Sequence, residues 1–280
     1  MNAVISASRR TDLPAFFPGF LADALRAERI AVAGPRGRAR EADLSPGAVH
    51  TLVLWSKDFS RLLGGEAGLR GLLRKYDQIY ILFTVTGLGG TAAEPGAPRP
   101  AAALAQLPAL VELAGDPRRV SLRFDPVVSW RRGGRLATNL DFFERAAEAA
   151  AAARLTDVRF SFAQWYGKAV RRAGRTGFAF HDPAEEDKLA AAGRLAALAA
   201  ARGLKLHACA QAFLARVPGV LRSSCIDGRL LAELHPRGEP ATTAKDRGQR
   251  PECGCTASID IGSYAQRCGH GCVYCYANPD

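Results

Sequence analysis

Short β-branched and aromatic runs alternate with amphipathic segments along most of the 280-residue chain. This alternation predicts strands joined by crossover helices, which together form a mainly parallel α/β sheet. Runs such as YILF and LVLW are apolar at every position, as expected of strands covered by helices. Six or seven such units are too many for a small flavodoxin-like fold, so we expect a full or partial (β/α) barrel of the TIM type. The predicted strands are Val4–Ser8, Leu52–Ser56, Ile79–Thr84, Val120–Phe124, Val158–Phe162, Leu204–Ala208 and Ser258–Ile261.

Two segments depart from this alternation. Ile30–Asp43 is expected to form a β-hairpin with a Gly/Arg tip, after which Ser45 and Pro46 would begin a short helix. Pro236–Pro251 is polar and rich in helix breakers, so it is expected to be a long loop. We expect one domain over residues 1–280, with the hairpin as an insertion at about 30–43. The predicted helices are Phe16–Ala27, Ala101–Leu113, Leu140–Ala153 and Pro183–Ala201.

Polar residues follow most of the predicted strands. Chemistry in parallel α/β sheets takes place at the carboxyl ends of the strands, so these residues are expected to form the rim of an active site. The segment SRRTD after the first strand could hold a carboxylate, a phosphate or an amino group, or it could be a surface turn capped by Asp12. Arg123 is expected either to face the site or to pair with Asp125. The residues at this rim are Ser8, Arg9, Arg10, Thr11, Asp12, Lys57, Arg123, Asp125 and Cys209.

The last residues of the chain contain three cysteines in a C-x3-C-x2-C pattern. Cys268, Cys272 and Cys275 provide three thiolates within eight residues, and thiolates are the usual ligands of iron–sulfur clusters. Gly269 and Gly271 would permit the positive φ angles of a wrapped loop. A 4Fe–4S cluster with three protein ligands leaves one iron open. The alternative is structural zinc, which would take its fourth ligand from His270, Cys253 or Cys255.

Four further cysteines could form a second site. Cys209, Cys225, Cys253 and Cys255 supply the number of ligands that an auxiliary 4Fe–4S cluster or a closed zinc site requires. Alternatively, Cys209 and Cys225 are ordinary buried thiols. The iron–sulfur segment of the chain is therefore expected to span residues 252–280.

The motif CGHGCVYC resembles the signature of the radical S-adenosylmethionine superfamily. The resemblance implies that Cys268, Cys272 and Cys275 hold a 4Fe–4S cluster whose free iron binds S-adenosylmethionine. Reductive cleavage of this cofactor would give a 5′-deoxyadenosyl radical, and Tyr274 would lie against the adenine. An electron donor such as flavodoxin or ferredoxin is implied as a partner.

A weaker similarity connects the chain to the spore photoproduct lyase-like branch, often labelled DNA repair photolyases. The shared dipeptides are Thr11-Asp12, Ser56-Lys57, Glu94-Pro95 and Pro126-Val127. In the superfamily the cysteine loop follows the first strand, whereas here it follows the last, which fits a circular permutation. The segments ISASRRTD, WSK and ECGCTASIDIG also resemble an uncharacterised bacterial family with its cysteine cluster at the C-terminus. A permutation predicts that Ser258–Ile261 lies beside Val4–Ser8, with the chain termini close together. Five residues follow Cys275, too few for the helix that normally follows such a loop.

These patterns lead to a functional expectation. The chain resembles a radical S-adenosylmethionine enzyme with an unknown substrate, and the alternative is a non-catalytic iron–sulfur or zinc protein. Arg9, Asp12, Lys57 and Asp125 are the expected catalytic residues. The expected cofactor contacts are Ser8, Arg10, Thr11, Arg123 and Tyr274.

Charge and hydropathy indicate the partners. The net charge of +11 suits nucleic acid or a nucleotide, although scattered arginines also arise from genome composition alone. No apolar stretch reaches the roughly 20 residues that span a bilayer, and the first residues do not form a signal peptide. A cytoplasmic protein without a membrane partner is therefore expected.

Overall fold

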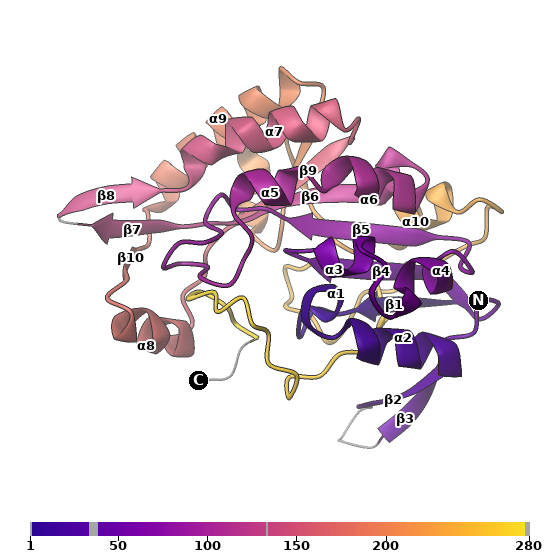
Figure 1. The fold of residues 1–280 in the computed structure, drawn as a ribbon. Coiled ribbons are helices and arrows are strands. Elements are labelled where there is room, and N and C mark those ends of the chain that lie inside the picture. The colour runs from indigo at the N-terminus through magenta and orange to yellow at the C-terminus, as the bar shows by residue number, and fades with distance from the viewer. Residues whose placement is uncertain (1, 34–38, 133, 278–280) are drawn as a thin grey trace.

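The computed structural model describes residues 2–33, 39–132 and 134–277. Its main feature is a parallel sheet of eight strands in the order β12-β11-β9-β6-β5-β4-β1-β13 (Figure 1). The seven predicted strands are confirmed, and the three-residue edge strand β12 is an addition. In the described ranges no ladder joins β12 to β13, so the sheet is open rather than a closed barrel. The strands are β1 (Ala3–Ala7), β4 (Val49–Ser56), β5 (Ile79–Thr84), β6 (Val120–Val127), β9 (Asp157–Phe162), β11 (Lys205–Ala208), β12 (Val220–Arg222) and β13 (Ile259–Asp260).

The strand before the cysteine loop lies beside the first strand of the chain. β13 pairs in parallel with β1, with Ile5 opposite Ile259 and Ser6 opposite Asp260. This confirms the adjacency that a permutation predicts. The expected proximity of the two chain ends concerns residues outside the described ranges.

The crossover helices cover one face of the sheet. Strand residues such as Ile5 and Phe83 pack there against helical residues such as Leu21, Leu110 and Phe143. In Figure 1 helices α5, α6, α7 and α9 lie above the strands, and the yellow C-terminal segment passes below them. The helices are α1 (Leu13–Phe16), α2 (Pro18–Ala27), α3 (Ser60–Leu63), α4 (Leu69–Leu73), α5 (Pro100–Leu104), α6 (Leu107–Ala114), α7 (Phe143–Ala152), α8 (Gly167–Arg175), α9 (Glu185–Ala200) and α10 (Gly228–Leu234). Short 3-10 turns are Glu66–Gly68, Pro117–Arg119, Leu140–Phe142 and Ala212–Arg216.

The opposite face of the sheet has a different cover. Val4, Val53 and Tyr80 alternate with the residues that face the crossover helices. They pack against Ile226, which precedes α10, and against Leu231 within α10. The two apolar faces of each strand are therefore explained by crossover helices on one side and by α10 with the following loop on the other. This second face leads up to the candidate site.

Several local expectations can now be assessed. The hairpin is confirmed as β2 (Arg29–Ala33) paired with β3 (Ala39–Asp43), while its tip, residues 34–38, lies outside the described ranges. The prediction of a short helix beginning at Ser45 and Pro46 was wrong. Those residues form a turn, because only five residues separate β3 from β4 and the Asp43 carboxylate accepts a hydrogen bond from Ser45 N (2.8 Å). The segment 236–251 is a loop, as expected.

The sequence did not predict a second, antiparallel sheet. Its strands are β10 (Ala179–His181), β7 (Ser129–Arg132) and β8 (Arg135–Thr138), in that order. The ring of Trp165 stacks on that of Phe180 with 4.3 Å between centroids. Within the described ranges, no helix has the length and apolar character needed to cross a membrane.

Candidate functional site

A cavity of about 880 Å³ opens where the strands end. This volume falls within the range of known ligand-binding sites. Every residue predicted for the site lines it, so the residues expected at the strand ends surround one cavity, and their roles stay predictions. The polar members are Ser8, Arg9, Arg10, Thr11, Asp12, Lys57, Arg123, Asp125 and Tyr274, and the thiols are Cys209, Cys225, Cys253, Cys255, Cys268, Cys272 and Cys275.

Asp12 connects three segments at this rim. One carboxylate oxygen accepts hydrogen bonds from Ala15 N (3.0 Å), which caps α1, and from Ser56 Oγ (2.7 Å) at the end of β4. The other oxygen accepts from Lys57 N (2.9 Å) and contacts His270 Nε2 (2.8 Å) in the cysteine loop. Asp12 does cap a turn, but it is buried rather than on the surface. These contacts give Asp12 a positioning task, and its catalytic role stays a prediction.

His270 is fixed on both sides of its ring. Its Nε2 contacts the Asp12 carboxylate, and its Nδ1 lies 3.1 Å from the carbonyl oxygen of Gly96. The His270 and Phe16 rings pack in a T-shaped arrangement with 4.7 Å between their centroids. A zinc ligand needs a free ring nitrogen. Because both nitrogens are engaged with oxygen atoms, the structure argues against His270 as the fourth ligand of a zinc site.

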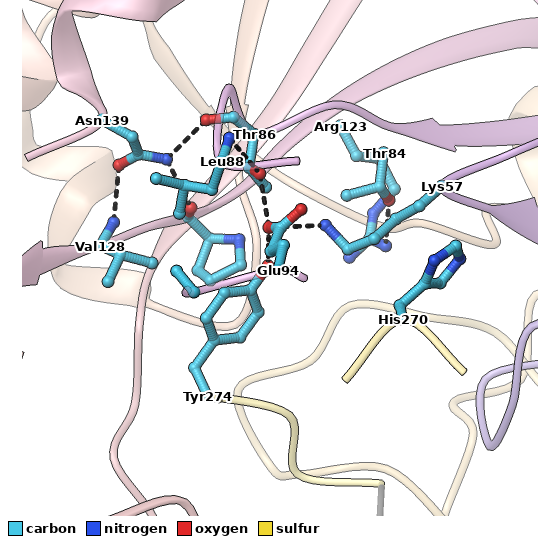
Figure 2. A network of polar contacts seen from close by, with 12 residues as sticks. Lys57, Thr84, Thr86, Leu88, Glu94, Arg123, Val128, Asn139, His270 and Tyr274 are labelled. Atoms are coloured by element: carbon cyan, nitrogen blue, oxygen red, sulfur yellow. Dashed lines mark hydrogen bonds and ion pairs between the residues drawn. The ribbon is translucent and has the colours of Figure 1, made fainter. Parts of the chain in front are cut away.

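A buried carboxylate, Glu94, organises the space beside the loop (Figure 2). Its Oε1 accepts hydrogen bonds from Lys57 Nζ (2.9 Å), Thr86 Oγ1 (2.5 Å) and the Tyr274 hydroxyl. The ammonium of Lys57 also lies 5.8 Å from the centre of the Tyr274 ring. The sequence singled out Glu94 only within a shared dipeptide. The usable signal was an acidic residue in an otherwise small and apolar loop directly after a strand.

The protonation states of this network follow from its charges. Burial opposes the charge on Glu94, but the Lys57 ammonium and the donated hydrogen bonds hold the pKa of Glu94 below its ordinary value. Burial likewise opposes the charge on Lys57, but Glu94 keeps the pKa of Lys57 above its ordinary value. Burial and the charge of Glu94 raise the pKa of Tyr274, so its hydroxyl stays protonated and donates to Glu94. The contact of Tyr274 with adenine stays a prediction.

The loop that carries Glu94 docks directly on the cysteine loop. Gly96 N donates to the carbonyl of His270 (3.0 Å), and Val273 N donates to the carbonyl of Ala93 (3.0 Å). A Cβ at Gly96 would lie 2.2 Å from the carbonyl oxygen of Gly269, so only glycine allows this approach. On the other side, Arg172 Nη1 from α8 donates to the carbonyl of Cys275 (3.0 Å).

The two glycines of the cysteine loop have different tasks. Gly271 has a φ of +64°, as predicted. The same expectation was wrong for Gly269, which is absent from the positive-φ glycines of the described chain. Gly269 is needed for space instead, because a Cβ there would lie 2.5 Å from the Phe16 ring.

The three thiols of this loop differ in exposure. Cys272 is buried, and Cys268 and Cys275 are half-buried. Burial, followed by the charge of Asp12, raises the pKa of Cys268 to about 12, and burial also raises the pKa of Cys272. Such thiols ionise at neutral pH only when a metal or another cation stabilises the thiolate.

The donor set must be compared with the cluster that the sequence predicts. In the described part of the chain, no group of three or more His, Cys, Asp or Glu side chains is arranged to hold a metal ion. The donor atoms nevertheless suit an iron–sulfur cluster, because three thiols from one loop line a cavity large enough for a ligand. Binding a cluster would require the thiols to rotate towards it.

Two arginines flank Trp55 at the centre of the cavity. The guanidinium groups of Arg9 and Arg123 lie 5.3 and 5.2 Å from the centre of the Trp55 ring. Arg9 pairs with Asp246 (3.4 Å), and Arg123 pairs with Asp125. Arg123 thus both lines the cavity and pairs with Asp125, so the two predicted alternatives hold together.

Of the remaining predicted contacts, Ser8 and Arg10 have partners and the Thr11 hydroxyl has none in the described structure. Ser8 Oγ donates to Asp260 (2.5 Å), and Arg10 Nη1 donates to the carbonyl of Gly262 (3.1 Å). No pattern in the sequence pointed to Asp260. Its carboxylate also accepts a hydrogen bond from Arg9 N (2.7 Å) and so joins β13 to the end of β1. The Thr11 hydroxyl is buried and has no hydrogen-bond partner among the described residues.

Replacing Asp12 with alanine should destabilise the protein strongly. Loss of the helix cap costs about 1 kcal/mol, and the buried donors left without an acceptor bring the total to about 2–4 kcal/mol. Asp227 provides a matched control, because among the described residues its carboxylate accepts only from Arg229 N and Leu230 N at the start of α10. Urea unfolding should show a loss of about 1 kcal/mol for Asp227→Ala. Equal losses of unfolding free energy in the two variants would contradict the conclusion that Asp12 holds three segments together.

The Glu94–Lys57 pair should produce a defined dependence of stability on pH. The folded pKa of Glu94 is below its ordinary value of 4.5, so its contribution is present above that value and is lost as the pH falls through the folded pKa. The folded pKa of Lys57 is above its ordinary value of 10.5, so its contribution is present below that value and is lost as the pH rises through the folded pKa. The free energy of unfolding, measured in urea across this range, should fall less steeply at both ends in Glu94→Gln/Lys57→Met than in the wild type. Identical pH profiles would contradict this expectation.

Comparison with known proteins adds a family. A search of curated proteins found no match. A family model described as "Domain of unknown function (DUF1848)" matches residues 4–277, which is nearly the whole chain. The protein therefore belongs to the DUF1848 family.

Proposed function

We propose that this protein is a radical S-adenosylmethionine enzyme. One observation carries the proposal: the loop of Cys268, Cys272 and Cys275 follows β13 and faces a cavity of about 880 Å³ where the strands of a parallel sheet end. Parallel α/β folds place their chemistry at that edge. The motif resemblance supplies the identity of the cofactors.

Cys268, Cys272 and Cys275 would hold the 4Fe–4S cluster. When bound, the cluster supplies the electron for reductive cleavage of S-adenosylmethionine. The contacts of Asp12 with His270 and of Glu94 with Tyr274 hold the ligand loop in place from two sides. The cysteine loop would therefore keep its position when cofactor and substrate bind beside it.

The arginines of the cavity suit the carboxylate of the cofactor. The side chains of Arg9 and Arg123 both line the cavity. A buried cationic N–H group gains substantially from an anionic acceptor. Arg10, which also lines the cavity, adds a third positive charge.

The substrate is proposed only as a class. The excess of basic residues favours a nucleotide or nucleic acid, and the sequence leaves the electron donor as a flavodoxin or ferredoxin type of protein. Membership of a family does not identify a substrate or an electron donor, so both must be identified from the chemistry of the site.

Anaerobic reconstitution tests the proposal. Protein loaded with iron and sulfide and then reduced should show an EPR signal of a 4Fe–4S cluster that changes when S-adenosylmethionine is added, and it should release 5′-deoxyadenosine. An intact, reducible cluster without cleavage would instead support a non-catalytic electron-transfer protein. Stoichiometric zinc without iron would support a structural site.

A further inference from the structure

The four cysteines outside the C-terminal motif converge on one side of the cavity. Cys209 follows β11, Cys225 follows β12, and Cys253 and Cys255 precede β13. The Sγ atoms of Cys209 and Cys225 are 3.7 Å apart. Cys225, Cys253 and Cys255 belong to one buried cluster, and Cys209 packs against it. Three segments that are distant in sequence therefore bring four thiols together.

The surroundings of these thiols carry buried positive charge. Arg9 and Arg123 line the same cavity as the four cysteines. Arg9 Nη2 and Arg123 Nε are both buried and lack a hydrogen-bond acceptor in the described chain. A buried cationic N–H group without an acceptor is costly, whereas four neutral thiols provide only weak acceptors. Asp246 and Asp125 pair with the two arginines but leave these N–H groups without an acceptor among the described residues, so the arrangement can take a further anionic group.

We infer that Cys209, Cys225, Cys253 and Cys255 bind a second, thiolate-ligated metal centre next to the C-terminal cysteine loop. Four thiolates around either Zn²⁺ or a 4Fe–4S core form an anionic centre whose sulfur atoms accept the free N–H groups of Arg9 and Arg123. Binding of Zn²⁺, or of a preformed 4Fe–4S core, releases four S–H protons to solvent and transfers no electron.

The distance between Cys209 and Cys225 is compatible with two ligands of one zinc ion, whereas in a 4Fe–4S core each thiolate binds a different iron and the thiols would have to move further apart. Two sulfur atoms at 2.3 Å from one tetrahedral ion lie about 3.8 Å apart, close to the 3.7 Å between Cys209 and Cys225. The described side chains hold no ready group of three metal ligands, so the thiols must turn from one another towards the metal. Such rotations about χ1 leave the backbone in place.

The decisive protein is a triple variant, Cys268→Ala/Cys272→Ala/Cys275→Ala, which keeps only the four thiols of the inferred site. After anaerobic reconstitution it should retain about four irons with sulfide per chain, or about one zinc. Adding Cys225→Ser and Cys255→Ser should remove that metal. A folded triple variant without stoichiometric metal would overturn the inference. Because this variant lacks the ligands of the C-terminal loop, its metal content does not depend on the proposed enzyme activity.

A measurement on the wild-type chain covers the case in which the variants do not fold. Metal-loaded protein is alkylated with iodoacetamide before and after treatment with a chelator, and each cysteine is followed by mass spectrometry. The four thiols should react at least about tenfold faster once the metal is removed, since thiolate–metal bonds protect them. Equal rates before and after chelation would also overturn the inference. Total iron distinguishes the two metals: about eight irons per chain indicate two clusters, and about four irons with one zinc indicate a mixed pair.

Discussion

Replacing Cys272 with serine should reduce release of 5′-deoxyadenosine to the background of protein without cluster. Cys272 is the most buried of the three loop cysteines. Serine preserves the size of the side chain but offers oxygen, which iron–sulfur clusters bind far less readily than thiolate. Iron content, EPR signal and cleavage should therefore fall together. The cleavage product is measured by liquid chromatography after anaerobic reconstitution.

The matched controls come from the same segment. Cys268→Ser and Cys275→Ser should behave like Cys272→Ser, because each removes one of three ligands. Ser263→Ala, an exposed position between β13 and the motif, should retain both cluster and cleavage. Substantial cleavage by Cys272→Ser would exclude the cysteine loop as the cluster site. Loss of zinc, rather than iron, in all three serine variants would support the structural alternative.

The main sheet was predictable because its strands are buried on both faces. Each of the seven predicted strands is a continuous apolar run or a short run bounded by polar residues, and the structure differs by only a few residues at their ends. β12 was missed because it has only three residues and lies at the edge of the sheet, where two of them are exposed. Such a strand leaves almost no hydrophobic pattern.

The second sheet could not be predicted for a different reason. Its strands have the sequences SWRR, RLAT and AFH, without a clear apolar alternation. These strands form because they pair with one another, and Trp165 and Phe178 pack beside them at 5.9 Å. β7 and β8 are adjacent in the chain, and only the pairing of β10 with β7 joins distant segments, which no short window of sequence encodes.

The site shows the same division. Strand order alone places Arg9, Lys57 and Asp125 at one rim, because parallel strands share their carboxyl edge. The ties of Glu94 and His270 join residues that are 180 and 258 positions apart in the chain. No local pattern reports such contacts. The sequence therefore predicts which residues surround the cavity, whereas the structure shows which of them hold the cysteine loop.

Removal of the Glu94 carboxylate should cost about 3–5 kcal/mol of unfolding free energy. Glu94→Ala leaves the ammonium of Lys57, which is 13% exposed, without its acidic partner. It also removes the acceptor of Thr86 and Tyr274, so the contact between the loop carrying Glu94 and the cysteine loop should loosen. The shift of the urea midpoint at constant slope measures the loss. Glu185→Gln, which removes an exposed ion pair with Arg216, should leave the midpoint unchanged.

A double-mutant cycle separates the pair from the rest of the network. Glu94→Gln alone leaves the Lys57 charge buried, and Lys57→Met alone leaves the Glu94 charge buried, so both single variants should be strongly destabilised. Combining them removes both charges while keeping the shape of the side chains. The double variant should therefore lose clearly less stability than the sum of the two, with an interaction energy of about 2 kcal/mol or more. Additive losses would show that the two side chains do not act as a pair, and the Glu94 network would then have to hold the cysteine loop through Thr86 and Tyr274 alone.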